Sequence, residues 1–223
     1  MPMVLLNVEI DFNIINDIIK IEQMFLFKNL YMSNKVYEML EKEIWLWYYR
    51  FVMRSICGLI LPTTGSITID NQQLHKDIMI PQSIGALIEN PAFLPQYTGY
   101  KNLKLLASLT GNIADKEIKK ALECVGLEPQ DERVYKKYSL GMKQKLGIAN
   151  AIMGEPDIII LDEPINALDE ESVKLIKEEL LRLKKNGKLI MIACHDKEEL
   201  EYLCDTIYEM KCGRIVGQEN LSV

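Results

Sequence analysis

The sequence predicts an α/β domain with a mainly parallel sheet. From Arg54 onward, short β-like runs alternate with helical ones, which is typical of strands joined by helices. Two runs, Asp157–Leu161 and Lys188–Ala193, are apolar after their first residue, as in strands buried on both faces of a parallel sheet. The 223 residues are enough to bury a sizeable core in one domain, or in one domain with a small subdomain.

The elements follow in chain order. After the turn PTTG, alternation predicts a half-buried strand over Ser66–Asp70. Helical spacing predicts helices over Tyr100–Leu109, Ala114–Val125 and Leu140–Met153, and Gly126 ends the second of them. The remaining predicted elements, in chain order, are a buried strand over Asp157–Leu161, a helix over Glu171–Lys185, a buried strand over Lys188–Ala193 and a helix over Asp196–Leu203. A closing hairpin is predicted over Thr206–Lys211 and Arg214–Gly217.

Composition excludes several classes of protein. A net charge of −6 without a basic run argues against a nucleic-acid binder. Five cysteines without a C-x-x-C pair indicate neither a disulfide framework nor a zinc site, so a reducing cytoplasm is expected. The N-terminus MPMVLLNVEIDF lacks the basic region of a secretory signal. The apolar stretch Trp45–Pro62 is short and contains Arg50 and Arg54, so it is a poor membrane span.

Two adjacent acids follow the first buried strand, in IIILDEP (158–164). The carboxyl end of a parallel strand borders the crevice where open α/β sheets bind ligands. There Asp162 can hold a hydrated Mg²⁺ through water, and Glu163 can polarise an attacking water. By itself, a strand that ends in D-E-P is also compatible with a simple turn.

A second candidate anion site lies in YSLGMKQKLGIANAI (138–152). A helix that starts at Ser139 presents its unpaired N–H groups, and the positive end of its dipole, to an anion. Gly141 lets the anion approach the backbone closely, and the Ser139 hydroxyl adds a donor.

In order and spacing, these motifs resemble those of the nucleotide-binding subunits of ABC transporters, over residues 54–217. Tyr138–Met142 is similar to the signature motif, and Asp162 and Glu163 are similar to the Walker B pair. NALD, residues 166–169, is similar to the D-loop, and His195 in MIACHD to the switch histidine.

The resemblance implies a P-loop NTPase fold of the ABC type, with the ATP-binding domain over residues 53–217 and a helical subdomain at about 95–150. It implies ATP and Mg²⁺ as cofactors, and a dimer in which the signature element caps the γ-phosphate bound to the opposite subunit. The dimer is either a homodimer or a heterodimer. The resemblance implies that Glu163 and His195 are catalytic and that Asp162 binds the metal through water. The implied nucleotide-binding residues are Ser139, Gly141, Glu89 and Asp169.

Two departures from the general family pattern point to one branch of it. Leu140 stands in place of the first signature glycine, and Glu89 in place of the usual Q-loop glutamine. At both positions, the sequence is similar to the motifs of exporters of the bacitracin and lantibiotic self-protection type. Residues 90–100 then correspond to the region that contacts a membrane permease. The aromatic residues Phe93, Tyr97 and Tyr100 serve either for docking or for packing.

The phosphate-binding loop of the family is missing. Residues 1–57 contain no glycine, and counting back from Met53 puts the expected lysine at Tyr49 and its flanking glycine at Tyr48. Bulky side chains block the nest of backbone N–H groups that binds phosphates. Arg50 supplies a cation without the loop geometry, so ordinary nucleotide binding is expected to be lost or severely weakened.

Three interpretations remain open. The chain is an ATP-hydrolysing subunit that powers export of a peptide or antibiotic through a separate permease, peripheral on the inner face of the cell membrane. Alternatively, it is a non-hydrolysing partner subunit, or an inactive remnant. Residues 1–52 match nothing in the family, and a frameshift, deletion or alternative start would explain them. Within them, periodicity does not decide between an amphipathic helix and two strands for DFNIINDIIKIEQMFLFKNL.

Overall fold

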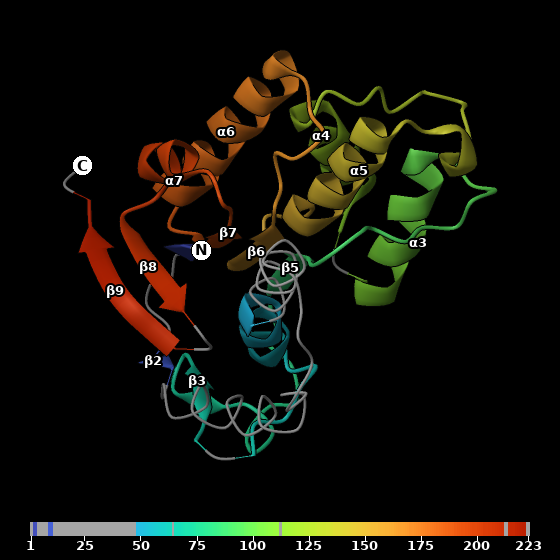
Figure 1. The fold of residues 1–223 in the computed structure, drawn as a ribbon. Coiled ribbons are helices and arrows are strands. Elements are labelled where there is room, and N and C mark those ends of the chain that lie inside the picture. Colours follow the sequence, from blue (N-terminus) through green and yellow to red (C-terminus); the bar gives the residue numbers. More distant parts are fainter. Residues whose placement is uncertain are drawn as a thin grey trace, which may run out of the picture. The chain divides into compact units, whose positions relative to one another are not determined.

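The structure, a computed structural model, describes residues 2–3, 9–10, 48–63, 65–111, 113–211 and 214–221 (Figure 1). The alternatives for DFNIINDIIKIEQMFLFKNL lie outside the described residues. The chain divides into two compact units. The central unit is Ser83–Cys194, and the terminal unit combines Met1–Gln82 with His195–Val223.

The sheet of the central unit is parallel. β5 (Ile84–Leu87) pairs with β6 (Ile158–Asp162), which pairs in turn with β7 (Leu189–Ala193). Every residue of β6 is buried, as its isoleucine run requires. The two buried strands predicted from sequence are therefore confirmed as β6 and β7.

Helices flank this sheet along the chain. α5 packs against β5 and β6, and α6 packs against β7 and α4. The predicted helices are confirmed, with their ends shifted by at most one residue. The helical elements are α3 (Gly99–Thr110), α4 (Asp115–Cys124), the 3₁₀ turn η1 (Tyr135–Lys137), α5 (Leu140–Ile152) and α6 (Glu170–Lys185). The domain limits and the helical subdomain at about 95–150 stay predictions.

The sequence of α6 explains its limits. Asp169 caps its first turn by accepting hydrogen bonds from the Ser172 N–H at 2.9 Å and the Ser172 hydroxyl at 2.7 Å. Glutamates occupy its first turn and basic residues its last, which complements the helix dipole. Ile176, Leu180 and Leu183 recur at helical spacing and are buried, so one face of α6 covers the core.

In the terminal unit, the described strand pairs are antiparallel. β8 (Thr206–Lys211) and β9 (Arg214–Asn220) form the predicted closing hairpin, and β1 (Pro2–Met3) pairs with β8. A second small sheet contains β2 (Glu9–Ile10), β3 (Ile67–Ile69) and β4 (Gln72–Gln73). The remaining helices of this unit span residues 48–56 and Lys197–Leu203, the latter being α7.

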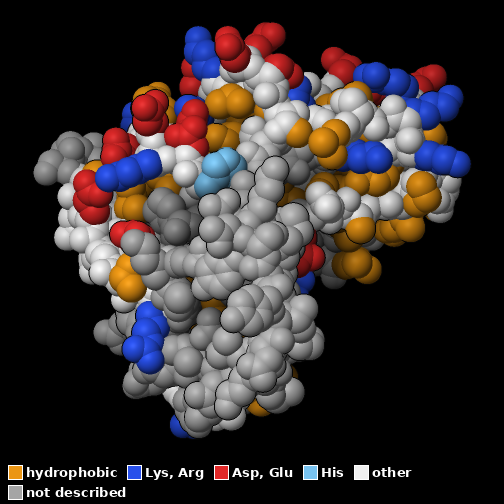
Figure 2. All heavy atoms as spheres, viewed as in Figure 1, with side chains coloured by type: hydrophobic (Ala, Val, Ile, Leu, Met, Phe, Trp, Pro, Cys, Tyr) orange, Lys and Arg blue, Asp and Glu red, His pale blue; other side chains and the backbone are white. Residues whose placement is uncertain are grey.

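The described surface mixes charges of both signs on the face drawn in Figure 2, where Lys and Arg side chains alternate with Asp and Glu. Within the described part of the chain, no helix is both long enough and apolar enough to cross a membrane.

Candidate functional site

The two adjacent acids lie at the carboxyl end of β6. Asp162 is its last residue and only 3% exposed, and its Oδ2 accepts a hydrogen bond from the Glu89 N–H at 3.0 Å. Glu163 follows, and its N–H donates to the Ala193 carbonyl at the end of β7, at 2.9 Å. Because β5, β6 and β7 are parallel, their carboxyl ends bring Glu89, Asp162 and Glu163 to one edge of the sheet.

The backbone is strained at this edge. Glu89, Glu163 and Ala167 have φ angles of +63°, +47° and +63°. Left-handed conformations of this kind cost non-glycine residues roughly 1–3 kcal/mol, and they cluster at functional sites. The Glu163 carboxylate is also held in place, since its Oε2 accepts a hydrogen bond from the Asn166 amide at 3.1 Å.

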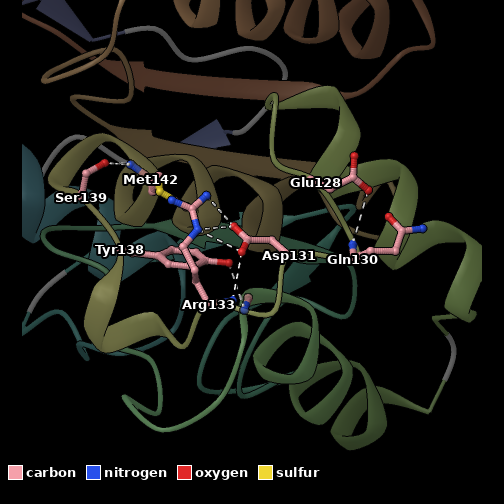
Figure 3. Close-up of polar contacts among 8 residues, drawn as sticks. Glu128, Gln130, Asp131, Arg133, Tyr138, Ser139 and Met142 are labelled. Carbon is pink, nitrogen blue, oxygen red and sulfur yellow. Dashed lines mark hydrogen bonds and ion pairs between the residues drawn. The ribbon is translucent and has the colours of Figure 1, made fainter.

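The N-terminus of α5 lies exposed. Ser139 is the N-cap, and its hydroxyl accepts a hydrogen bond from the Met142 N–H at 3.2 Å (Figure 3). A Cβ placed on Gly141 would meet the Ala167 carbonyl at 3.0 Å, so the missing side chain lets the segment after Glu163 approach the helix. Ser139 and Gly141 therefore occupy the helix start that the sequence predicts for anion binding.

Asp169 acts first as the cap of α6. Hydrogen bonds from Ser172 lower the pKa of the Asp169 carboxyl to about 2, with a smaller contribution from Lys145, whose Nζ lies 3.7 Å away. This carboxylate is exposed and stays ionised at neutral pH. It completes the segment 163–169, which joins the acids to α6.

His195 begins the terminal unit, two residues after Ala193. Ala193 is the β7 residue that pairs with Asp162 in the parallel register. The His195 side chain is exposed, and the next residue, Asp196, caps α7 through the N–H groups of Glu198 and Glu199.

The positions expected to hold the phosphate-loop lysine and its flanking glycine are described, and both are buried. Tyr48 and Tyr49 are 6% and 2% exposed, in the helix over residues 48–56. Their buried rings stand in place of the glycine, whose bare backbone approaches the phosphates, and of the lysine, whose ammonium neutralises them. The residues of this segment do not fit the β- and γ-phosphates of ATP.

Asp162 fits a water-mediated Mg²⁺, because this ion keeps several waters and needs one or two carboxylates. Among the described residues, no group of three or more His, Cys, Asp or Glu side chains could hold a metal ion directly. Bound Mg²⁺ would neutralise phosphate charge. Asp162 would orient the ion's water shell, and the Glu89 N–H fixes the Asp162 carboxylate.

The interpretation from sequence assigned no role to Gln144. Its side-chain amide donates to the Glu163 carbonyl at 3.0 Å and to the Pro164 carbonyl at 3.3 Å. A helical-spacing signal could have found it, since residues 141, 144 and 145 share one face of α5. Of the aromatic residues in 90–100, Phe93 packs edge-on against Tyr135 and Tyr97 is exposed. Tyr100 hydrogen-bonds Asp115.

Comparison with known proteins places the chain in a family. The family model described as ABC transporter matches residues 51–166. The chain is 46% identical over 170 residues to the ABC transporter ATP-binding protein YybJ of Bacillus subtilis (strain 168), covering 76% of this chain and 78% of that protein. It is 41% identical over 172 residues to the bacitracin transport ATP-binding protein BcrA of Enterococcus faecalis, covering 76% of this chain and 56% of the relative.

The similarity extends to the lantibiotic transport ATP-binding protein SrtF of Streptococcus pyogenes, with 35% identity over 176 residues and 76% of each chain covered. The chain thus spans three-quarters of some of these relatives and just over half of others.

Solved structures agree on the fold. An ATP-binding subunit of an ABC transporter superposes with a TM-score of 0.69 at 26% identity, covering 77% of this chain and 73% of that one. The dimeric ATP-binding cassette MJ0796, bound to ADP and phosphate, gives 0.71 at 24% identity, covering 78% and 81%. The predicted α/β fold of the ABC type is confirmed, and the chain belongs to the ABC transporter family of ATP-binding proteins.

Proposed function

We propose that this chain is the ATP-binding subunit of an exporter, coupling ATP binding and hydrolysis to export of a peptide or antibiotic of the bacitracin or lantibiotic kind. Its relatives include transport ATP-binding proteins named for both substrates. The proposed partners are a separate membrane permease and a second ATP-binding subunit, with the chain on the inner face of the cell membrane.

One observation supports this proposal most strongly: hydrogen bonds hold both acids at the end of β6 in place. The Glu89 N–H fixes Asp162, and the Asn166 amide fixes Glu163 in a strained backbone. A simple turn needs none of these contacts. In the proposed roles, Asp162 orients Mg²⁺ through water, while Glu163 and His195 act on the attacking water. Ser139 and Gly141 face the phosphate of the opposite subunit.

A different observation favours a second candidate function, that of a non-hydrolysing partner. The helix over residues 48–56 buries Tyr49 where the phosphate-loop lysine is expected. In that role the chain offers the start of α5 to ATP held by an intact subunit and has no productive site of its own. The third interpretation, an inactive remnant, requires that the chain fail to fold cooperatively.

Calorimetric titration of MgATP into the purified Glu163→Gln chain tests these functions. The substitution removes the group proposed to polarise water, so turnover does not obscure binding. Micromolar affinity is expected if the chain binds ATP by itself. No heat at millimolar MgATP, from a chain that unfolds in a single cooperative transition, would contradict cis binding and leave the partner role. A chain without such a transition would support the remnant.

A further inference from the structure

One face of α5 lies against the segment that carries the proposed catalytic acid. This segment, residues 163–169, is called the acid segment below. At Gly141, the Ala167 carbonyl approaches within 3.0 Å of where a Cβ would stand. Lys145 lies 3.7 Å from the Asp169 carboxylate. Gln144 lies between these two contacts along the helix, at the level of Glu163 itself.

Gln144 acts on the backbone of the acid segment. Its Nε2 donates to the carbonyls of Glu163 and Pro164, at 3.0 and 3.3 Å. Carbonyl oxygens only accept, so the nitrogen of the amide must face them, and a carboxylate in its place would repel both. The Glu163 carbonyl accepts a second bond, from the Asn166 N–H at 3.3 Å.

These bonds fix the direction of the Glu163 side chain. The residue has a φ of +47°, which a non-glycine residue keeps only where its surroundings hold it. Gln144 holds the carbonyl side of Glu163, and the Ala193 carbonyl holds its N–H. The Asn166 amide, placed by the same turn, then holds the Glu163 carboxylate.

We propose that Gln144 is a positioning residue for Glu163. It acts by hydrogen bonding to the backbone, and through Asn166 it sets where the carboxylate points. This inference deepens the proposed function, on which the catalytic role of Glu163 rests. It also means that the helix whose start carries Ser139 is bonded directly to the acid of its own chain.

Nuclear magnetic resonance of the isotope-labelled full chain tests the proposal, with the Glu163 carboxyl signal assigned by its loss in Glu163→Gln. Gln144→Glu keeps the shape of the side chain but removes the donor, and Gln144→Met removes both polar groups. Lys143→Gln is the matched control: it also lowers the charge by one, on the neighbouring residue, whose ammonium lies over the Tyr135 ring.

Gln144→Glu is expected to shift the Glu163 carboxyl and Asn166 amide signals most, and Gln144→Met less. In both variants, hydrogen exchange of the Asn166 backbone N–H should rise about fivefold or more, because the turn that holds this N–H loses the stabilising hydrogen bonds from the Gln144 amide. Lys143→Gln should leave all these signals in place. If side-chain shape were what matters, Gln144→Glu would be the milder variant; that order, or unchanged signals in both, would overturn the proposal.

Steady-state MgATP hydrolysis supplies a second readout. Mispositioning of Glu163 should lower kcat in both Gln144 variants and leave KM nearly unchanged, because binding does not use this carboxylate. If the unsubstituted chain shows no hydrolysis, the cis-hydrolysing function fails, whereas the order of the resonance shifts still decides the role of Gln144.

Discussion

Gly99 and Tyr138 meet where α3 begins. The buried Tyr138 hydroxyl accepts a hydrogen bond from the Gly99 N–H at 3.2 Å. A Cβ on Gly99 would lie 2.6 Å from that oxygen, so only glycine leaves room for it. The N–H belongs to the first turn of α3, where helices lack internal acceptors. Tyr138, which directly precedes the Ser139 cap of α5, is thereby bonded to a second helix, α3.

Replacing Tyr138 by Phe should lower the free energy of unfolding by about 1–3 kcal/mol, because the buried Gly99 N–H loses its acceptor. Urea denaturation measures the change. Tyr97→Phe removes the same hydroxyl from a side chain that is 39% exposed, and it should stay within about 0.5 kcal/mol of the unsubstituted chain. Equal effects of the two variants would contradict the assigned hydrogen bond.

At the scale of elements, Glu155 joins three helices. It follows α5, and its carboxylate accepts from Lys120 of α4 at 2.5 Å and from Arg182 of α6 at 2.7 Å. Arg182 also pairs with Glu179 at 2.7 Å. The hydrogen bond from Lys120, and then that from Arg182, lower the pKa of the Glu155 carboxyl.

The Cys124 thiol of α4 has a raised pKa of about 11. Its burial is the main cause, and the charge of Glu179 adds to it, so this cysteine is a poor nucleophile.

The lowered pKa of Glu155 predicts a pH dependence. The folded chain binds the Glu155 proton more weakly than the unfolded chain, so the stabilisation is complete above the ordinary carboxyl value of about 4.3 and is lost as the pH falls below it. In Glu155→Gln, the free energy of unfolding should fall less steeply on acidification. Urea denaturation at several pH values measures this.

Glu178→Gln, at an exposed position of the same α6, serves as the control and should keep the slope of the unsubstituted chain. Identical slopes for the Glu155 and Glu178 variants would show that the ion pairs of Glu155 do not contribute.

For the whole molecule, the helix over residues 48–56 matters most. Val52, Met53 and Ile56 are buried on it together with Tyr48 and Tyr49. The segment is therefore part of the buried core, and restoring one lysine does not restore a phosphate loop.

Tyr49→Lys should destabilise the chain by more than about 3 kcal/mol, because an ammonium replaces a ring that is 2% exposed. It should also give no gain in MgATP binding. Leu59→Lys makes a comparable change at a side chain that is 68% exposed, and should alter stability by at most about 0.5 kcal/mol. Denaturation and calorimetry measure both effects; a gain of MgATP affinity in Tyr49→Lys would refute the assignment to the core.

Much of the fold is local in origin and was predictable. Neighbouring residues determine the helix caps at Ser139 and Asp169, the apolar run of β6 and the periodic face of α6. Motif order likewise indicated the family and the acids at the end of β6. The sequence did not show that residues 48–49 are helical, because bulky aromatic residues are compatible with several conformations.

The sequence by itself thus determined the order of the elements, the family and the candidate acids, since each depends on residues close together in the chain. Only the tertiary structure decided which groups hold those acids. The Glu89 N–H meets Asp162 across 73 positions, and the Gln144 amide meets the Glu163 carbonyl across 19. Such pairs depend on strand register and on how α5 packs against the sheet, and these follow from the combined packing of many residues and from no single motif.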